Sequence, residues 1–141
     1  MEGSSAAKRA IFIPEDFGSP ASSVPTRVLK GACHCGAVHF EVRTEAVPRI
    51  TSCNCTFCRK KNSISLKVHE TDIRIVSGRE HLSLYQWHTR TAQHWFCARC
   101  GIYAFHRTRK RPDHFGVNAF CVAGLEVDPD RIEKLNGIGS P

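Results

Sequence analysis

The sequence contains no long hydrophobic run. A membrane-spanning helix needs roughly 18 or more consecutive apolar residues, and no segment of the chain comes near that length. The first apolar patch, Ala10 to Ile13, ends at Pro14 and is too short for a secretory leader. We therefore expect a cytoplasmic protein without a membrane partner.

Length and charge limit the class of protein further. A chain of 141 residues fits one domain rather than two. Twenty Lys and Arg against thirteen Asp and Glu give a formal net charge of +7. This charge suits an anionic partner, but it does not choose between nucleic acid, an acidic surface and a small polycarboxylate.

Apolar and polar residues alternate along most of the sequence from Val28 onward, with the period of two that is typical of β-strands. The strands predicted in this way cover residues 38–42, 64–68, 73–76, 82–87, 93–97, 102–106 and 115–120. Two short helical turns are predicted, one within 55–61 and one near 129–134, where Asp128 can cap. The pattern therefore predicts a mainly β fold with little helix.

Composition divides the chain into three regions. Residues 1–27 mix Gly, Ser, Ala and Pro, and we expect them to form a flexible N-terminal arm. Residues 28–135 carry the strand pattern and all of the cysteines, and they form the predicted domain. Residues 136–141 are expected to form a loose C-terminal tail.

The cysteines are the most informative residues. Eight in this length lie below the density of a disulfide-linked scaffold, and without an export signal a reducing compartment favours thiolates that hold metal. Seven fall into three tight clusters, while Cys121 stands alone. The clusters are Cys33-x-Cys35, Cys53-x-Cys55-x-x-Cys58 and Cys97-x-x-Cys100.

The first and third clusters repeat one pattern, a cysteine pair followed by a glycine and then a strand. At Gly36 and Gly101 the chain must turn sharply, often with positive φ, so that backbone N–H groups can face a thiolate. Two such turns supply four thiolates, which is a common closed shell of structural zinc. The residues assigned to this structural zinc are Cys33, Cys35, Cys97 and Cys100.

The middle cluster has one cysteine too few for a closed shell. Three protein ligands and an exchangeable fourth position are typical of catalytic zinc. Cys53, Cys55 and Cys58 are therefore the candidate ligands of a second zinc and the candidate catalytic residues. Arg59 and Lys60 directly follow and are the candidate substrate-binding residues, since their charges can hold substrate carboxylates.

Two alternatives stay open for this cluster. Cys121 could complete its shell and leave two inert zincs, or the three cysteines could belong to a redox triad. The histidines do not decide the matter, because none can be named as a general base from its spacing alone. The basic run from Arg107 to Arg111 resembles a nucleic-acid patch, but such runs more often form a solvated loop or bind a small anion, so we do not expect nucleic acid as a partner.

Four motifs occur in a fixed order along the chain. They are Gly31-x-Cys33-x-Cys35-Gly36-x-Val38, Cys53-x-Cys55-x-x-Cys58-Arg59-Lys60, Phe96-Cys97-x-x-Cys100-Gly101 and Val117-Asn118-x-x-Cys121. In this order they resemble the glutathione-dependent formaldehyde-activating enzyme family, and the resemblance runs from about Val28 to Asp128. Residues 82–89 and 94–103 further resemble the branch of that family that includes centromere protein V.

The resemblance implies a tent-like zinc fold of short antiparallel sheets, with a closed structural zinc and a second, labile zinc on Cys53, Cys55 and Cys58. It implies a carbon-sulfur lyase or synthase that joins glutathione and formaldehyde reversibly as S-(hydroxymethyl)glutathione, with Arg59 and Lys60 helping to place the tripeptide. The centromere protein V branch admits an alternative, a non-catalytic zinc-stabilised binding module whose basic surface engages an acidic partner. The physiological substrate, the oligomeric state and the role of Cys121 stay open.

Overall fold

The structure is a computed structural model that describes residues 11–20 and 23–137. Its strands are β1 (Arg27–Ala32), β2 (His39–Thr44), β3 (Ile50–Cys53), β4 (Ser65–His69), β5 (Ile73–Ser77), β6 (Leu82–Tyr85), β7 (Gln93–Cys97), β8 (Tyr103–Arg107), β9 (His114–Asn118) and β10 (Glu133–Leu135). The helices are α1 (Thr56–Lys61) and the 3-10 helices η2 (Glu70–Asp72), η3 (Arg79–His81), η4 (Ala119–Cys121) and η5 (Pro129–Arg131). The predicted mainly β fold with little helix is confirmed.

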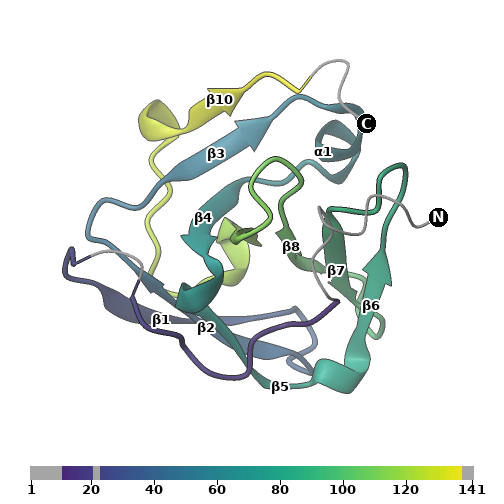
Figure 1. The fold of residues 1–141 in the computed structure, drawn as a ribbon, viewed down its shortest axis with the longest axis horizontal. Helices are drawn as coiled ribbons and strands as arrows, with labels where there is room; N and C mark the ends of the chain where they lie inside the picture. The colour runs from purple at the N-terminus through teal and green to yellow at the C-terminus, as the bar shows by residue number, and fades with distance from the viewer. Residues whose placement is uncertain (1–10, 21–22, 138–141) are drawn as a thin grey trace.

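The strands form two sheets, which Figure 1 shows one below the other. The smaller sheet has the order β1-β2-β5 and is antiparallel. The larger sheet has the order β10-β3-β4-β9-β8-β7-β6, and its neighbours are antiparallel except β10 and β3, which run parallel at one edge. None of the helices in the described parts of the chain has the length and apolar character that crossing a bilayer requires.

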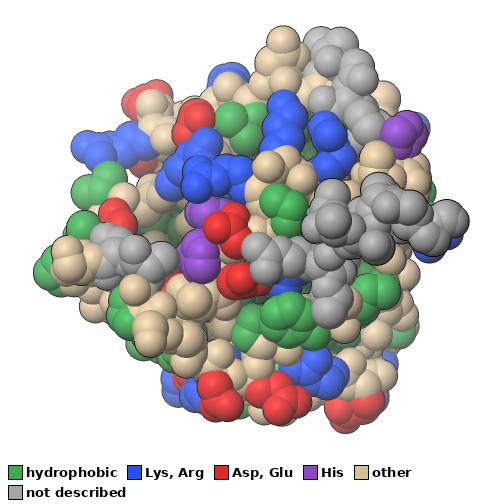
Figure 2. Space-filling model, viewed as in Figure 1, with side chains coloured by type: hydrophobic (Ala, Val, Ile, Leu, Met, Phe, Trp, Pro, Cys, Tyr) green, Lys and Arg blue, Asp and Glu red, His purple; other side chains and the backbone are tan. Residues whose placement is uncertain are grey.

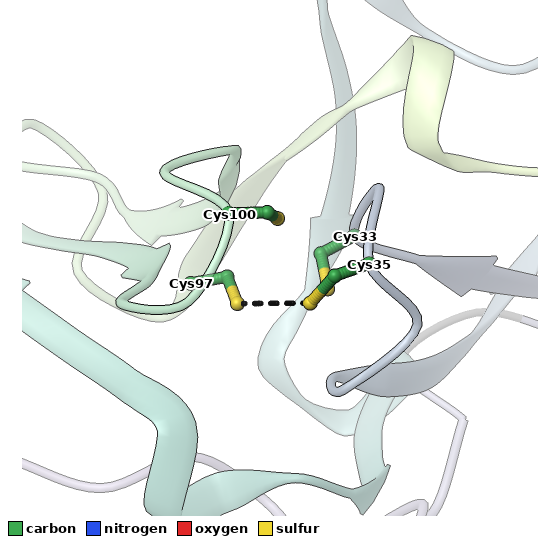
Figure 3. A group of neighbouring side chains, drawn as sticks. All are labelled: Cys33, Cys35, Cys97 and Cys100. Atoms are coloured by element: carbon green, nitrogen blue, oxygen red, sulfur yellow. Dashed lines mark hydrogen bonds between the residues drawn. The ribbon is translucent and has the colours of Figure 1, made fainter.

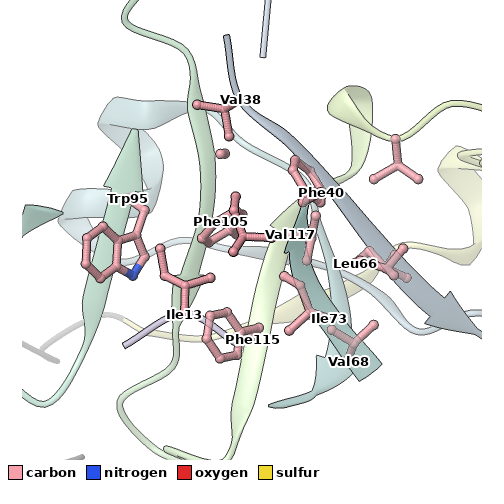
Figure 4. Packing of buried hydrophobic residues seen from close by; sticks show 14 of the residues in the cluster. Ile13, Val38, Phe40, Leu66, Val68, Ile73, Trp95, Phe105, Phe115 and Val117 are labelled. Atoms are coloured by element: carbon pink, nitrogen blue, oxygen red, sulfur yellow. The ribbon is translucent and has the colours of Figure 1, made fainter. Parts of the chain in front are cut away.

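Alternation along the strands sends one face of each sheet into a common core (Figure 4). Phe105 of β8 is fully buried at its centre, with ring centroids 5.3 Å from Phe40 and 6.1 Å from Phe115. Such aromatic side chains remove much apolar surface from water, which is the main favourable contribution to folding. Because residues alternate, the other face of β4, β9, β8 and β7 is left to carry polar side chains.

The segment before β1 was expected to be a flexible arm. Its residues 1–10 and 21–22 lie outside the described residues. In between, Ile13 is buried with 4% of its surface exposed, and the carbonyl of Pro14 accepts a hydrogen bond from Ile75 N at 2.7 Å. Gly18 N donates to the carbonyl of Thr71 at 2.9 Å. These contacts hold residues 13–18 against the smaller sheet and η2.

The sequence interpretation placed Arg107 in a solvated basic loop, and this is wrong. Arg107 ends β8 and is fully buried, and its guanidinium donates to Glu70 Oε1 and to the Pro112 carbonyl, each at 2.6 Å. The alternation of β8 explains its position, since Arg107 shares the core-facing side of the strand with Phe105. The remainder of the basic run, residues 109–111, lies in the loop between β8 and β9.

Candidate metal centres and cavity

The four-cysteine group joins two turns that are far apart in the sequence (Figure 3). Cys33 and Cys35 follow β1, and they face Cys97 and Cys100 at the end of β7. All four sulfur atoms lie within 4.8 Å of one another. The sulfur of Cys35 lies 3.7 Å from that of Cys33 and 3.8 Å from that of Cys97. Tetrahedral metal–sulfur bonds of about 2.3 Å require sulfur separations of about 3.8 Å, so this spacing fits a zinc-sized ion.

The two turns close in the same way. Gly36 and Gly101 have φ values of 82° and 79°, as the sequence pattern predicted. Gly36 N donates to the Cys33 carbonyl at 3.3 Å, and Gly101 N donates to the Cys97 carbonyl at 2.7 Å. A side chain at either glycine would be strained, because φ in this range brings Cβ too close to the backbone.

Backbone N–H groups face the sulfurs of this group. Val38 N lies 3.4 Å from the Cys33 sulfur. The backbone N–H groups of Cys35 and Ile102 lower the pKa of Cys100 to about 6, against a smaller effect of burial. Donors of this kind stabilise thiolates, which are the form of cysteine that binds metal.

The three-cysteine group gathers around the start of α1. Cys53 ends β3, Cys55 precedes the helix and Cys58 lies within it, and their sulfur atoms are within 4.8 Å of one another. The Cys55 sulfur caps the helix by accepting a hydrogen bond from Cys58 N at 3.3 Å, and Cys55 N lies 3.5 Å from the Cys53 sulfur. Among the described residues, no fourth His, Cys, Asp or Glu joins the group.

Burial and local donors act in opposite directions on these thiols. Burial raises the pKa of Cys58 to about 12, against the nearby charge of Lys61. Burial also opposes ionisation of Cys55, but hydrogen bonds from Cys58 and neighbouring groups outweigh it and lower the Cys55 pKa. Lys61 Nζ lies 3.8 Å from the ring centroid of Tyr103 and has no hydrogen-bond partner in the described part of the chain, and burial lowers the Lys61 pKa to about 8. A bound divalent cation would ionise all three thiols.

The residues after β10 cover one side of the three-cysteine group. Asn54 N donates to the Leu135 carbonyl at 3.3 Å, and Gly137 N donates to Asn54 Oδ1 at 2.6 Å. A Cβ atom on Gly137 would lie only 2.8 Å from the Cys53 sulfur. The first two residues of the expected loose tail are therefore packed against the site, while residues 138–141 lie outside the described residues.

A cavity of about 320 Å³ opens beside this group. Cys53, Cys55 and Cys58 all line it, whereas no member of the four-cysteine group does. Its wall includes the rings of Phe57 and Trp87, and no Asp or Glu of the described residues contributes to it. The charged residues that line it are Arg49, Lys67, Arg109, Lys110 and Arg111.

Two buried histidines also line this cavity. His94 is 5% exposed, and its ring centroid lies 4.3 Å from that of Phe57 and 4.9 Å from that of His106. Neither of its nitrogens has a hydrogen-bond partner among the residues that the structure describes. Burial lowers the His94 pKa to about 3. His106 Nδ1 forms a hydrogen bond with the Tyr103 hydroxyl, and burial places the His106 pKa well below its ordinary value. Both imidazoles are therefore neutral at pH 7.

Three residues named from the sequence lie away from the cavity. Arg59 and Lys60 are exposed on α1 and do not line it. Cys121 belongs to neither cysteine group, its sulfur lies 3.8 Å from the Tyr103 carbonyl, and burial raises its pKa to about 11. The alternative in which Cys121 completes the middle cluster finds no support in this arrangement.

Fold and site together define a small, mainly β protein with two cysteine groups that can hold metal ions. A family model described as glutathione-dependent formaldehyde-activating enzyme matches residues 28–133. The chain belongs to this family.

Two individual proteins are similar to the chain. A Halomonas elongata protein, whose name assigns it provisionally to the glutathione-dependent formaldehyde-activating enzymes, is 37% identical over 82 residues. The match spans about half of its length, 52%, and 52% of this chain. A Rhodobacter sphaeroides protein of known crystal structure is 42% identical with a TM-score of 0.66, and the match covers 76% of this chain and 97% of that one.

Proposed function

We propose that this protein is a zinc-dependent carbon-sulfur lyase or synthase that acts on the adduct of a small thiol and an aldehyde, of the S-(hydroxymethyl)glutathione synthase type. The main support is the contrast between the two cysteine groups, because the group of three lines a cavity and the group of four does not. A reactant could therefore reach a metal ion at the three-cysteine group, whereas at the four-cysteine group four sulfur ligands would complete the tetrahedral shell of the ion.

The two groups take different roles in this proposal. Cys33, Cys35, Cys97 and Cys100 hold a structural zinc, and Cys53, Cys55 and Cys58 hold a second, labile one. When bound, the second zinc would supply Lewis acidity, which lowers the pKa of a substrate thiol or polarises an aldehyde oxygen. Arg59 and Lys60 lie outside the cavity, so they can contact only a part of the substrate that projects from it.

In the synthetic direction the reaction forms one carbon–sulfur bond and transfers one proton from sulfur to oxygen. The substrate thiol loses its proton, its sulfur forms a bond to the aldehyde carbon, and the carbonyl π electrons move to the oxygen. That oxygen takes up the proton, so that RSH and H₂CO give RS–CH₂–OH. His94 lines the cavity as a neutral ring, and its two nitrogens have no hydrogen-bond partner among the described residues, so it can donate a hydrogen bond to this oxygen. The rings of Phe57 and Trp87, with centroids 4.8 Å apart, give one wall an apolar surface.

The test is the rate at which formaldehyde exchanges between free glutathione and its adduct, followed by NMR exchange spectroscopy. Because the spontaneous reaction is appreciable, each rate is compared with buffer. We expect wild-type protein with two zincs per chain to accelerate exchange, and Cys58→Ser to lose the acceleration and one zinc. Cys121→Ser is the matched control and should keep both. If the two-zinc wild type is no faster than buffer with several thiols, the enzyme proposal fails and the non-catalytic binding module is left.

A further inference from the structure

Three cations follow one another along α1, and only the third of them turns inward. Arg59 and Lys60 are exposed, whereas the ammonium of Lys61 is buried. Lys61 stands three residues after Cys58, and side chains at this spacing lie on the same face of a helix. The helix therefore directs Lys61 to the side on which Cys58 joins the three-cysteine group.

The ring contacts of Lys61 do not replace the water that its ammonium has lost. Lys61 Nζ lies 3.8 Å from the ring centroid of Tyr103 and 4.8 Å from that of Phe57, and it has no hydrogen-bond partner among the described residues. An aromatic face attracts a cation, but it is only a weak acceptor for the N–H groups of that cation. A buried ammonium in these surroundings is costly unless an anion lies close to it.

The three-cysteine group can supply this negative charge. Burial lowers the Lys61 pKa, and the charges of the three cysteines oppose that effect, with Cys58 the strongest of them. The influence is mutual, because burial raises the Cys58 pKa and the charge of Lys61 opposes the rise. Lys61 and the three thiolates therefore stabilise one another as charged groups.

Metal binding makes the negative charge of the group permanent. Zinc binds cysteine as the thiolate, so a divalent ion with three such ligands keeps one net negative charge. The ammonium of Lys61 brings the sum of these charges to zero. Because Coulomb interactions are strongest where water is excluded, one buried cation matters more here than several solvated ones.

Most other cations around the cavity are solvated or already paired. Lys110 and Arg111 are exposed at its rim. Figure 2 shows Lys and Arg side chains at the surface in the region where Figure 1 shows β3 and the loop between β8 and β9. Arg49 donates two hydrogen bonds to Glu133, at 2.8 and 3.0 Å. Water and salt screen such surface charges, so they contribute little to the thiolates.

Lys67 is the other lysine on which these cysteines act. Burial and the charge of Arg49 lower the Lys67 pKa, and the charges of Cys58 and Cys53 oppose this. Lys67 lines the cavity, where a ligand can also pair with it, whereas Lys61 does not line the cavity. A ligand in the cavity therefore does not compete with the thiolates for the charge of Lys61.

We propose that Lys61 is a positioning residue for the second metal ion, whose buried ammonium is the counter-charge that lets three thiolates gather around a divalent cation. The proposal rests on the metal-binding role that the proposed function gives to Cys53, Cys55 and Cys58. Lys61 itself contacts no substrate. Its effect on the reaction passes through the thiolates and the ion that they hold.

The experiment measures metal binding without turnover. Lys61→Met removes the charge and keeps a long side chain, and Lys61→Arg keeps the charge. Lys134→Met is the matched control, because it removes an exposed lysine from β10, the strand that pairs with the Cys53 strand β3. Competition between the full chain and a chelator, with zinc counted per chain, gives the affinity of both sites in each variant.

We expect Lys61→Met to weaken the second zinc about 10- to 100-fold, which is typical when a group that supports metal ligands is removed, and to leave the first zinc in place. Lys61→Arg should recover most of the loss, and Lys134→Met should change neither site. An unchanged second-site affinity in Lys61→Met, or an equal loss in Lys61→Arg, overturns the proposal.

Urea unfolding separates this role from a merely structural one. When mild chelation has emptied the second site and the first is still loaded, Lys61 is a buried cation without its anion, so Lys61→Met should unfold at the wild-type midpoint or above it. Loading the second site should then raise the midpoint less in Lys61→Met than in wild type, because the variant binds that zinc more weakly. An equal loss of stability in both states would show that Lys61 only packs the fold, and the proposal would fail.

The two proposals can fail independently. If the second-site affinity depends on Lys61 but formaldehyde exchange by the two-zinc wild type is no faster than buffer, the enzymatic function is wrong and the counter-charge role stands. If exchange is accelerated and Lys61→Met binds the second zinc as tightly as wild type, the counter-charge role is wrong and the enzymatic function stands.

Discussion

Replacing Gly137 with alanine tests whether the end of the described chain supports the three-cysteine group. The added Cβ would lie 2.8 Å from the Cys53 sulfur and 2.8 Å from Cys55 Cβ. Normal contacts between such atoms are about 3.5–4.0 Å, so one side must move by roughly 1 Å. Neither side moves freely, because Gly137 N is held by Asn54 Oδ1 at 2.6 Å and Cys53 ends a paired strand.

The expected effect is a loss of metal affinity at one site only. Substitutions that displace groups supporting a ligand typically cost 10- to 100-fold in metal affinity, which is about 1.4–2.7 kcal/mol. We expect Gly137→Ala to weaken the second zinc by about this factor and to leave the first in place, because the four-cysteine group is not in contact with this segment. Competition with a chelator, with zinc counted per chain, measures both sites.

Gly124→Ala is the matched control. Unlike Gly137, Gly124 has a positive φ of 79°, and a Cβ there would lie an ordinary 3.7 Å from Leu29 Cδ2. It should therefore cost stability from backbone strain, about 1 kcal/mol, without changing either metal affinity. If Gly137→Ala keeps the wild-type affinity at the second site, the tail does not pack against Cys53 as described and the reasoning is refuted.

Three further predictions follow from buried groups. Arg107→Met should lower the free energy of unfolding by about 3–5 kcal/mol, since it removes two hydrogen bonds of 2.6 Å from a buried guanidinium. Arg111→Met, in the exposed loop, should change the free energy of unfolding little. Equal urea midpoints for the two variants would contradict this prediction. Cys97→Ser should give insoluble or unfolded protein, and a soluble variant with two zincs would contradict the structural role. Burial lowers the His94 pKa to about 3, below the value of about 6.5 in the unfolded chain. Between these two pH values the unfolded state binds more protons than the folded state. The wild-type protein therefore loses stability as pH falls from about 6.5 towards about 3, by up to about 1.4 kcal/mol per pH unit. His94→Phe should lack this part of the acid dependence in urea titrations at several pH values, and parallel curves for the two proteins would argue against it.

The cysteine turns could be predicted from the sequence because their geometry is local. A cysteine pair followed by Gly36 or Gly101 carries the turn within five residues, and the positive φ at both glycines follows from that spacing. The start of α1 directly after its N-cap residue, Cys55, is local in the same sense. The grouping of the cysteine clusters into two metal sites was predicted by counting the ligands that each cluster supplies. The structure brings together the same two groups.

The short strands at the edge of the larger sheet could not be predicted. β3 and β10 have four and three residues, which is too few to show a period of two. The predicted turn near 129–134 is in fact η5, capped by Asp128 as expected, followed directly by β10. β3 carries Cys53, and β10 leads into residues 136–137, which cover the three-cysteine group. Because these strands were not predicted, the surroundings of that group could not be predicted either.

The cavity could not be predicted from the sequence, because its lining depends on the pairing register of strands that are far apart in the sequence. Nothing local links Lys67 of β4 with His106 of β8 and His94 of β7. His106 lies opposite His94, and Gly116 of β9 separates His106 from Lys67. A glycine inside a strand of β-branched and aromatic residues was the available signal, and it indicates close approach of another group without saying which one.

Net charge shows the same limit, because a total says nothing about where the charges lie. The excess of +7 could not choose a partner, but the acids near the cavity and core are bound elsewhere: Glu133 by Arg49, Glu70 by Arg107 and Asp72 by Arg43. The cationic side chains left without such pairs within the described residues include Lys67 and residues 109–111, which line the cavity. A duplex presents its phosphates along a broad surface, whereas a concave volume of about 320 Å³ admits a small molecule. The position of the charge therefore favours a small anionic substrate over nucleic acid.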